Sequence, residues 1–399
     1  MPQTEEFYPR FSATYYARQR RSGFPALKFD PELEAEYLES FVAINVSRIR
    51  VASLSALSLI LLFVVMDRGF GQHIQPPSSE FMLVISGLSL LIPFFCTFLR
   101  NKQHLPELML VCTWILALSM VGVVWLGRAA RPDFPYEPLL LVTMYVYYLA
   151  GLPWGRAVFC GLGMWLAFVG SHLLGSAEVP MLMYAVFYLL VANVIGLLGR
   201  YTFEYQDRLA FLMQRELSYL AQHDSLTRLL NRRAFRVRAE LAWAQAQREC
   251  RPVGLLILDV DHFKAINDQH GHFAGDSVLR EIALLLKNLV KRPLDAAGRF
   301  GGDEFVAVWY DVDRVWFEDL QARLMASIQA LEYEVPGLKD VKVSGGAVLA
   351  WPNFALTLQG ALREADSNLY QVKQQARSQI RYTQLGAPQL DDESLMTGS

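Results

Sequence analysis

Two short segments in the C-terminal half of the chain carry acidic residues at spacings that suit metal chemistry. In the first, Asp259 and Asp261 stand two residues apart at the end of an apolar run, so a continuing strand would place both carboxylates on one side of its sheet. This arrangement suits Mg²⁺, which takes one or two carboxylates together with phosphate oxygens. Lys264 falls in the turn before the next helix, where main-chain N–H groups can cradle a phosphate. A solvated strand end explains an isolated pair of acids equally well.

The second segment holds two acids directly after two glycines. Gly301 and Gly302 separate apolar segments and predict a tight hairpin turn, and Asp303 and Glu304 follow at its edge. Such a turn is more often merely structural, but the carboxylates upstream favour a shared metal site. Between the two segments lie an amide, an imidazole and a carboxylate that can recognise the edge of a base: Asn267, His272 and Asp276.

The periodicity of this half predicts the elements that position these residues. Strands that alternate with helices imply an α/β fold, an α+β sandwich with helices packed on a sheet. The residues after about Leu385 are polar and acidic without an apolar period, so we expect a disordered tail. The expected strands are 253–260, 305–309 and 341–349, and the expected helices are 275–290, 317–331 and 356–375.

The composition excludes several classes of protein. Hydrophobic residues make up 53% of the 399 residues and charged residues 19%, which rules out a disordered chain. The formal net charge of -2 provides no basic field for binding nucleic acid. The four cysteines are scattered singly, so neither a zinc site nor a disulfide framework is expected.

The first half of the chain is markedly apolar, because residues 51–199 hold only 12 Asp, Glu, Lys or Arg residues. Six apolar runs fill this window. A helix needs roughly 20 residues to cross a bilayer, and buried helices of soluble proteins usually keep a polar stripe, so we predict six transmembrane helices. The first should begin earlier than its run, near Ile44 or Val46. The runs are 51–66, 81–99, 108–126, 138–154, 157–175 and 180–198.

The charges between the runs indicate an orientation. Lys and Arg residues lie before the first run and in the second and fourth loops, which places both ends of the six-span region in the cytoplasm. The third loop is the one equivocal case, because Arg128 and Arg131 are offset by Asp133 and Glu137. The runs themselves contain no charged residue, whereas transporters and ion pumps usually carry such groups at membrane depth. His172 lies near the outer end of its run, where an interfacial position is favoured over a ligand or proton site.

Residues 200–222 are polar but carry one apolar stripe. Its members follow one another at spacings of four, four and three residues, which keeps them on one helix face. Such a connector helix is suited to pair with a copy of itself, and the alternative is a solvated helix that packs on its own domain. We favour dimerisation. The stripe consists of Leu209, Met213, Leu217 and Leu220.

Three long motifs stand in order within residues 223–383. Residues 224–233 match the pattern D-x-L-T-x-L-x-N-R-R, residues 259–276 match D-x-D-x-F-K-x-x-N-D-x-x-G-H-x-x-G-D, and residues 301–305 read G-G-D-E-F. In these motifs the chain resembles the GGDEF family of diguanylate cyclases. The apolar region is not covered by the resemblance and looks like a membrane sensor module.

The resemblance implies a nucleotidyl-cyclase-like fold and the condensation of two GTP molecules into cyclic di-GMP with release of pyrophosphate. Two such domains would face each other in a homodimer, each with one GTP. By motif position, Mg²⁺ or Mn²⁺ would be held by Asp259, the carbonyl of Val260, Asp303 and Glu304. Asp303 and Glu304 would also be the catalytic acids.

The resemblance also assigns residues to the substrate and the product. In this family an R-x-x-D five residues before the signature forms an inhibitory site for the product, and here it is Arg292 and Asp295. Arg can make paired hydrogen bonds to a phosphate or a guanine edge. GTP would be bound by Phe263, Lys264, Asn267, His272, Asp276, Lys373 and Arg377.

The departures from the family pattern are mild. The usual closing motif is Y-x-A-K-x-x-G-R-N, and here Val372, Ala376 and Ser378 replace its alanine, glycine and asparagine. These changes put the local backbone in doubt rather than the activity. Gly345 stands where an aliphatic residue is more common.

We therefore expect a membrane-bound signalling enzyme of the bacterial inner membrane, with biofilm formation or motility as the usual output. One alternative is a catalytically weak cyclic di-GMP receptor, although such domains usually lose a signature acid. Another is a transporter with a regulatory domain, and a third is a cyclase with a different product. The expected parts are a cytoplasmic segment 1–45, a sensor region 46–199, a connector helix 200–222, a cyclase domain 223–384 and a tail 385–399.

Overall fold

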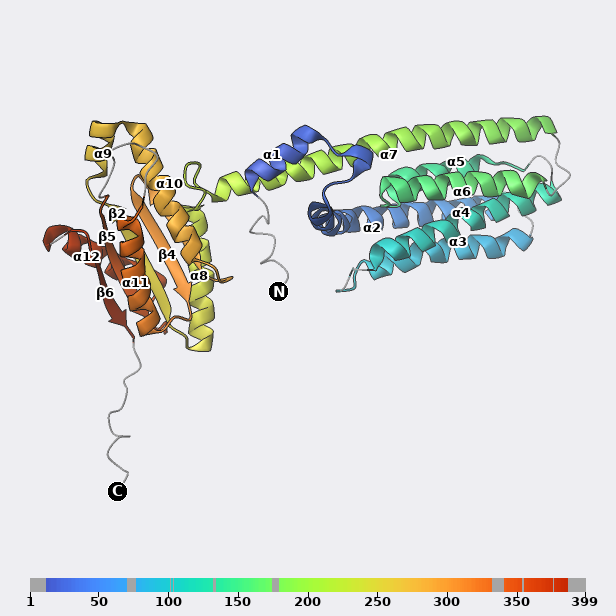
Figure 1. Ribbon diagram of the computed structural model, residues 1–399. Helices are drawn as coiled ribbons and strands as arrows, with labels where there is room; N and C mark the ends of the chain where they lie inside the picture. Colours follow the sequence, from blue (N-terminus) through green and yellow to red (C-terminus); the bar gives the residue numbers. More distant parts are fainter. Residues whose placement is uncertain are drawn as a thin grey trace, which may run out of the picture. The chain divides into compact units, whose positions relative to one another are not determined.

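The computed structural model of the chain describes residues 12–386 except 70–76, 101, 103, 132–133, 174–178, 332–340, 354 and 376. The chain forms two compact units, Thr14–Arg215 and the chain from Glu216 onward. We call them the helical unit and the sheet unit and describe each by itself (Figure 1). Of the tail expected at 385–399, all but the first two residues lie outside the described residues.

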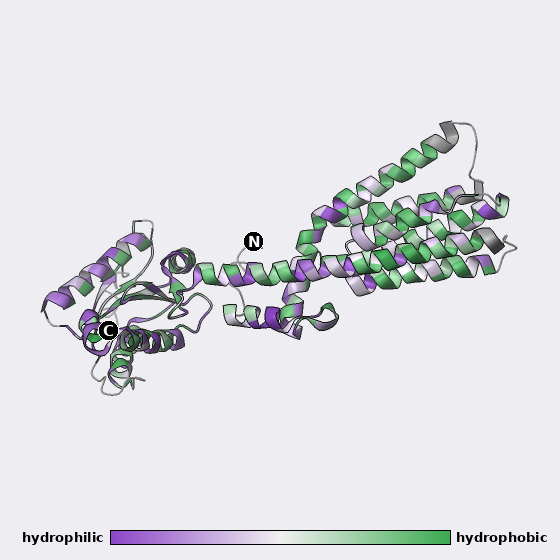
Figure 2. Ribbon diagram, turned by 90° about the horizontal axis from the view of Figure 1, so that it is seen from above, coloured by the Kyte–Doolittle hydropathy of each residue, from purple (hydrophilic) through white to green (hydrophobic). Residues whose placement is uncertain are grey.

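The helical unit is built mostly from helices rich in hydrophobic residues (Figure 2). Pro31 and the acids Glu32 and Glu34 begin the second helix, since proline suits a first helical position and acids complement the helix dipole. This helix therefore starts well before Ile44. The helices are α1 (Ala13–Ser22), η1 (Pro25–Leu27), α2 (Pro31–Gly69), α3 (Pro77–Cys96), α4 (Leu105–Ala130), α5 (Glu137–Met144), the π-helix η2 (Tyr145–Leu149), α6 (Trp154–Leu173) and α7 (Val179–Gln222).

Four of these helices are long and apolar enough to cross a membrane: Pro31–Val65, Leu105–Ala130, Trp154–Leu173 and Leu182–Gln222. The other two apolar runs fall in shorter helices, at Glu80–Cys96 and Glu137–Leu149. The described residues thus show four candidate spans, and the six predicted from the sequence are not confirmed. The fourth run is cut short because Gly151 adopts a φ of 67°, a left-handed conformation that ends a helix.

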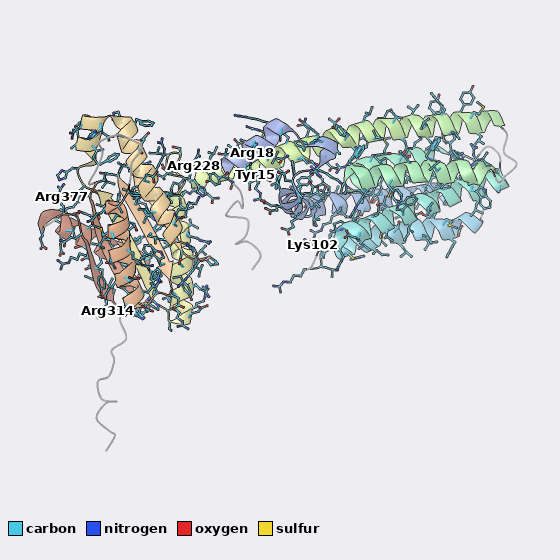
Figure 3. The ribbon with its side chains drawn as sticks, in the orientation of Figure 1. Tyr15, Arg18, Lys102, Arg228, Arg314 and Arg377 are labelled. Atoms are coloured by element: carbon cyan, nitrogen blue, oxygen red, sulfur yellow. The ribbon has the colours of Figure 1, made fainter. Side chains whose placement is uncertain are left out.

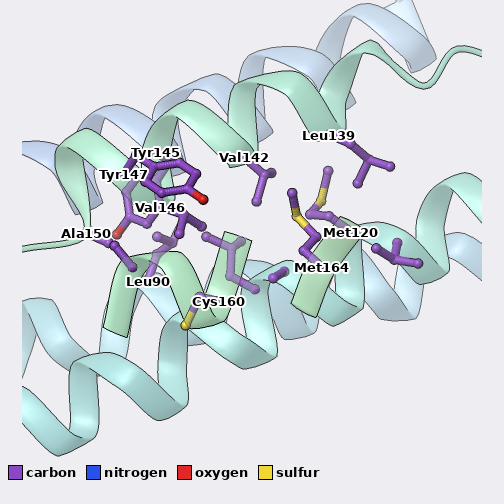
Figure 4. Close-up of a cluster of buried hydrophobic side chains, with 14 of the residues drawn as sticks. Leu90, Met120, Leu139, Val142, Tyr145, Val146, Tyr147, Ala150, Cys160 and Met164 are labelled. Carbon is purple, nitrogen blue, oxygen red and sulfur yellow. The ribbon is translucent and has the colours of Figure 1, made fainter. Parts of the chain in front are cut away.

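Tyr147 of η2 lies at the centre of the helical unit and packs against glycines of two neighbouring helices. A Cβ atom at Gly196 of α7 would stand 2.3 Å from its ring, and one at Gly161 of α6 would stand 2.6 Å from its hydroxyl. The Tyr147 hydroxyl donates to Asn193 Oδ1 at 3.1 Å. Small residues allow such close approach between membrane helices. Figure 4 shows the surrounding core, which includes Leu90, Met120, Cys160 and Met164.

His172 lies in the last turn of α6 and is buried, with Phe168 as its neighbour. Its Nδ1 atom is 3.0 Å from the carbonyl oxygen of Phe168, and the two rings are 4.4 Å apart between centroids. The residue is therefore near the end of its helix, as expected, but packs within the unit.

The start of α2 is joined to the later part of α7 by buried ion pairs. Arg208 donates to the two carboxylate oxygens of Glu34 at 2.7 and 2.8 Å and to Glu204 at 3.0 Å. Its guanidinium lies 4.9 Å from the ring centroid of Phe29 and 4.2 Å from that of Tyr37. The side chains of Arg208 and Glu204 are each only 3% exposed. The N-terminal segment therefore covers one face of α7.

The expected apolar stripe of the connector lies mostly on an uncovered part of α7. Leu209 is half-buried, whereas Met213, Leu217 and Leu220 are 40%, 66% and 48% exposed. The last span and the connector form one helix, α7, without a break in the described backbone. A continuous helix thus leads into the sheet unit.

The sheet unit contains a six-stranded mixed sheet with the order β1-β3-β4-β2-β5-β6. The central β2 is antiparallel to β4 and β5, while β1 and β6 are parallel to β3 and β5. The strands are β1 (Leu230–Asn231), β2 (Val253–Val260), β3 (Ala296–Gly301), β4 (Glu304–Tyr310), β5 (Val343–Ala350) and β6 (Ile380–Leu385). The helices are α8 (Arg232–Glu249), α9 (Phe263–His270), α10 (His272–Leu289), α11 (Arg314–Gln329) and α12 (Leu358–Gln375).

Helices cover both faces of this sheet (Figure 1). Leu256 and Leu258 of β2 belong to a core shared with α10 and α11. Leu255 and Ile257 belong to a second core shared with α8 and α12, because successive strand residues point to opposite faces. The expected α+β arrangement is confirmed for this unit.

Candidate active site

Asp259 and Glu304 lie side by side at the ends of two neighbouring strands. The register pairs Asp259 of β2 directly with Glu304 of β4, so both side chains stand on the same face. Asp259 continues the alternation of Leu255 and Ile257 and therefore faces α12. Lys373, in the last turn of α12, places its Nζ 2.8 Å from Asp259 Oδ1.

These carboxylates form a crowded anionic site. Burial raises the pKa of Asp259, and the charge of Asp303 raises it further, although the hydrogen bond from Lys373 opposes both effects. Burial also raises the pKa of Glu304, with the charges of Asp366 and Asp259 acting in the same direction. The Lys373 ammonium thus compensates negative charge at a place where a bound cation would do the same.

Asp303 lies in the hairpin turn between β3 and β4. Both glycines of the turn have positive φ angles, 148° and 55°, which is why glycine is needed there. Arg299 fixes the turn, since its Nε donates to Gly302 O at 3.0 Å and its Nη1 donates to Asp224 at 3.0 Å. The carbonyl of Asp303 accepts from Val260 N at 3.3 Å. The turn is therefore held against the end of β2.

Asp261 does not share the environment of Asp259, which corrects the expectation that the two carboxylates act as a pair. Strand β2 ends at Val260, so the alternation that would align them is broken by a turn. The Asp261 carboxylate is 4% exposed and accepts from Ser344 Oγ at 2.8 Å and from Ser378 N at 3.2 Å.

The three residues suited to recognise a base meet where α9 and α10 join. A Cβ atom at Gly275 would stand 2.1 Å from Asn267 Oδ1, so glycine is what lets the Asn267 amide lie against α10. Asp276 follows on α10, with a carboxylate oxygen 3.9 Å from Arg280. His272 is exposed at the start of the same helix.

The residues assigned to phosphates surround the turn between β2 and α9. Phe263 begins α9 and packs partly on the core, and Lys264 beside it is exposed. Arg377 lies beyond the end of α12 (Figure 3), with Nη1 3.1 Å from Nε2 of His262. Lys264 and Arg377 are thus cations near this turn, and Lys373 is the one that contacts Asp259.

Arg292 and Asp295 lie apart from this cluster, on the loop between α10 and β3. Asp295 accepts from the main-chain N of Tyr310 and of Arg292, both at 3.1 Å, and burial raises its pKa against these hydrogen bonds. Arg292 is exposed and donates to the carbonyl of Asp311 at 3.0 Å. Its guanidinium stands 5.7 Å from the ring centroid of Trp316.

The carboxylate oxygens of this site are ligands suited to a divalent cation. Among the described residues, no group of three or more His, Cys, Asp or Glu side chains is gathered as a ready metal cage. Asp259, Asp303 and Glu304 nevertheless offer the oxygen ligands that Mg²⁺ prefers, and Mg²⁺ usually completes its shell with phosphates and water. The Lys373 ammonium against Asp259 shows that this position accepts a positive charge.

An α+β fold with acids at a strand end and in the adjoining glycine turn defines the class of this unit. Residues 221–379 match the family described as the diguanylate cyclase GGDEF domain. This part of the chain is therefore a GGDEF domain.

Its relatives include named diguanylate cyclases. The chain is 33% identical over 175 residues to the probable diguanylate cyclase DgcT of Escherichia coli, covering 43% of this chain and 37% of that protein. It is 33% identical over 190 residues to the diguanylate cyclase TpbB of Pseudomonas aeruginosa, covering 44% and 41%. The chain thus spans about two fifths of the length of these curated relatives.

A solved structure of the coiled coil and GGDEF domain of DgcB from Caulobacter crescentus, in complex with c-di-GMP, is also similar. It is 25% identical, with 48% of this chain and 100% of that chain covered and a TM-score of 0.42. This score is too low to support a structural argument.

Proposed function

We propose that this chain is a membrane-bound diguanylate cyclase that condenses two GTP molecules into cyclic di-GMP and two pyrophosphates. The proposal rests chiefly on the placement of Asp259 and Glu304 on paired strands beside the Asp303 turn. A receptor that has lost catalysis usually lacks a signature acid, and this chain retains both. The GGDEF match over residues 221–379 supports the same activity.

In each half of the reaction, the 3′ oxygen of one GTP bonds to the α-phosphorus of the other. The bond from that phosphorus to pyrophosphate breaks, and the 3′ hydroxyl loses its proton. Asp303 is half-exposed in a fixed turn and would accept this proton, with Glu304 beside it. Mg²⁺ or Mn²⁺ held by Asp259, the carbonyl of Val260 and the two signature acids would neutralise the triphosphate and acidify the attacking hydroxyl.

The remaining residues would bind and orient GTP. Asn267, Asp276 and His272 would hold the guanine at the junction of α9 and α10. Lys264 and Arg377 would contact the phosphates, and Phe263 would support the turn between them. When GTP binds, the Lys373 ammonium would leave Asp259 and pair with the triphosphate, which is also anionic.

Membrane attachment and pairing of two chains complete the proposal. Six spans with both ends in the cytoplasm would hold the enzyme in the bacterial inner membrane, where the helical unit receives a signal. Four long apolar helices and two shorter ones support this. The exposed side chains of Met213, Leu217 and Leu220 support a homodimer through α7, which would bring two GTP-loaded domains together.

Incubation of the purified full-length chain with GTP and Mg²⁺ tests the activity. We expect cyclic di-GMP and pyrophosphate in a ratio of about one to two, as the reaction requires, with the nucleotide identified by mass spectrometry. Binding of cyclic di-GMP without synthesis would instead identify a receptor. A different cyclic nucleotide would refute the assigned substrate.

Reporter fusions test the orientation of the membrane region. A reporter enzyme that works only in the periplasm should be active when it is inserted after Gly71 or Ala177, because these positions follow the first and fifth apolar runs. A reporter inserted after Arg200 should be active in the cytoplasm. A periplasmic signal after Arg200 would separate the GGDEF domain from GTP and contradict the proposed topology.

Substitution of Arg292 tests feedback by the product. Arg292→Ala should raise the concentration of added cyclic di-GMP needed for half inhibition by about 10-fold or more, since a charged hydrogen bond contributes about 1.5–3 kcal/mol. The matched control is Arg314→Ala, which removes another exposed arginine of the sheet unit. Unchanged inhibition in Arg292→Ala would show that no inhibitory site operates there.

A further inference from the structure

Asp261 is a buried charge beside the proposed catalytic site that the reaction does not use. Ser344 Oγ lies 2.8 and 2.9 Å from its two carboxylate oxygens, and Ser378 N donates to Oδ2 at 3.2 Å. Its main-chain N donates to Lys342 O at 2.9 Å. Ser344 itself is fully buried.

These hydrogen bonds tie together three segments that are distant in the sequence. Asp261 lies in the turn after β2, Ser344 near the start of β5, and Ser378 in the loop between α12 and β6. Ser378 N also reaches Ser344 Oγ at 3.2 Å, so the serine hydroxyl lies between the other two groups. We call Asp261, Ser344 and Ser378 the Asp261 latch.

The Asp261 latch is stabilised because the buried Asp261 side chain needs hydrogen-bond donors. A buried carboxylate costs several kcal/mol unless hydrogen bonds satisfy it. Ser378 adopts a φ of 67°, a left-handed conformation that a non-glycine residue takes at an energetic cost. The hydrogen bonds to Asp261 and Ser344 therefore favour the left-handed conformation of Ser378.

Two of the cations assigned to the triphosphate lie in or just before this loop. Arg377 directly precedes Ser378 and reaches His262, and Lys373, one turn earlier, reaches Asp259. We propose that Asp261 is a positioning residue that holds Lys373 and Arg377 in place, so that both cations contact the triphosphate. This inference rests on the proposed function, and it assigns Asp261 no contact with the metal.

The test compares two ligands of the full-length chain: the unreactive α,β-methylene analogue of GTP, and GMP, which lacks the outer phosphates. In Asp261→Ala, affinity for the analogue should fall about 10-fold to 100-fold, the loss of about 1.5–3 kcal/mol expected when charged contacts are misplaced. Affinity for GMP should stay within about 2-fold, because the guanine contacts lie on α9 and α10.

Three further variants separate positioning from folding. Ser344→Ala removes the central hydroxyl and should weaken analogue binding in the same way. Asp261→Asn keeps one of the two acceptor oxygens and should bind the analogue better than Asp261→Ala does. Ser378→Ala is the matched control and should bind like the wild type, because its part in the latch is a main-chain N–H that alanine retains. If Asp261→Ala does not fold, Ser344→Ala and Asp261→Asn decide the matter.

Several outcomes would overturn the inference. Equal losses for the analogue and GMP would indicate a general structural role. A large change in the Mn²⁺ concentration needed for half-maximal analogue binding would make Asp261 a metal ligand. If the wild type binds the analogue but makes no cyclic di-GMP from GTP, the proposed activity is refuted and the comparison of variants still stands. If the wild type binds the analogue no better than GMP, the inference is refuted.

Discussion

Asp303→Asn is expected to lower the rate of cyclic di-GMP synthesis at least about 1,000-fold while the chain stays folded, since a positioned acid–base group contributes about 100-fold to 10,000-fold. Asparagine has nearly the same shape but neither the charge nor the basicity of the carboxylate. The turn itself depends on its glycines and on the hydrogen bonds from Arg299 to Gly302 O, so the substitution leaves it intact. Product formation by mass spectrometry and the thermal unfolding midpoint are the measurements.

The matched control is Asp319→Asn, which removes an exposed acid of the same domain on α11 and should leave the rate unchanged. Asp259→Ala should lose synthesis as Asp303→Asn does, because Asp259 is the acid that Lys373 now neutralises. A variant at Asp303 that retains near wild-type turnover would remove the basis of the active-site assignment.

Gly346→Ala is expected to destabilise the GGDEF domain by about 3 kcal/mol or more, a value at the severe end for overpacking. The added Cβ atom would stand 1.9 Å from the carbonyl oxygen of Ala365 and 2.3 Å from the N of Leu369. These are main-chain atoms of α12, so they can move only if the helix leaves β5. Urea unfolding followed by fluorescence measures the loss.

Gly345→Ala provides the control, because this neighbour points to the opposite face of β5. Its added Cβ atom would meet side chains, at 2.8 Å from Ile380 and 3.3 Å from Leu258, and side chains can adjust. We expect a loss of about 1 kcal/mol or less. Equal destabilisation by the two substitutions would contradict the packing argument.

The strongly periodic elements of the sheet unit could be predicted from the sequence, and the weakly patterned ones could not. The strand expected at 253–260 is β2, with the same bounds, because an unbroken apolar run of that length suits a central strand. Strand β3, Ala296–Gly301, is implied by the hairpin turn at Gly301 and Gly302, but its bounds could not be predicted, since its small residues and glycines carry a weak strand signal. Helix α8 was missed as well, because the stripe it buries is largely alanine, at positions such as Ala239, Ala242 and Ala246.

In the candidate site, features set by adjacent residues could be predicted, and contacts between residues distant in the sequence could not. The glycine turn and its acids follow from adjacent residues and were predicted in the right element. The environment of Asp261 could not be predicted, because its hydrogen-bond partner Ser344 lies 83 residues further along the chain. No sequence spacing relates the two residues. Six spans were expected and four helices of the described residues are long enough to cross a membrane, because the fourth apolar run continues past the end of its helix near Gly151.

The ion pairs around Arg208 constrain how the sequence of this chain can change in evolution. Breaking a buried pair by removing one partner costs about 3–5 kcal/mol, so Glu34, Glu204 and Arg208 cannot drift independently. A lineage must change them together or keep them together, although residues 34 and 208 lie at opposite ends of the helical unit in the sequence. In chains that carry a related helical unit, we therefore expect these three charges to be kept together or replaced together.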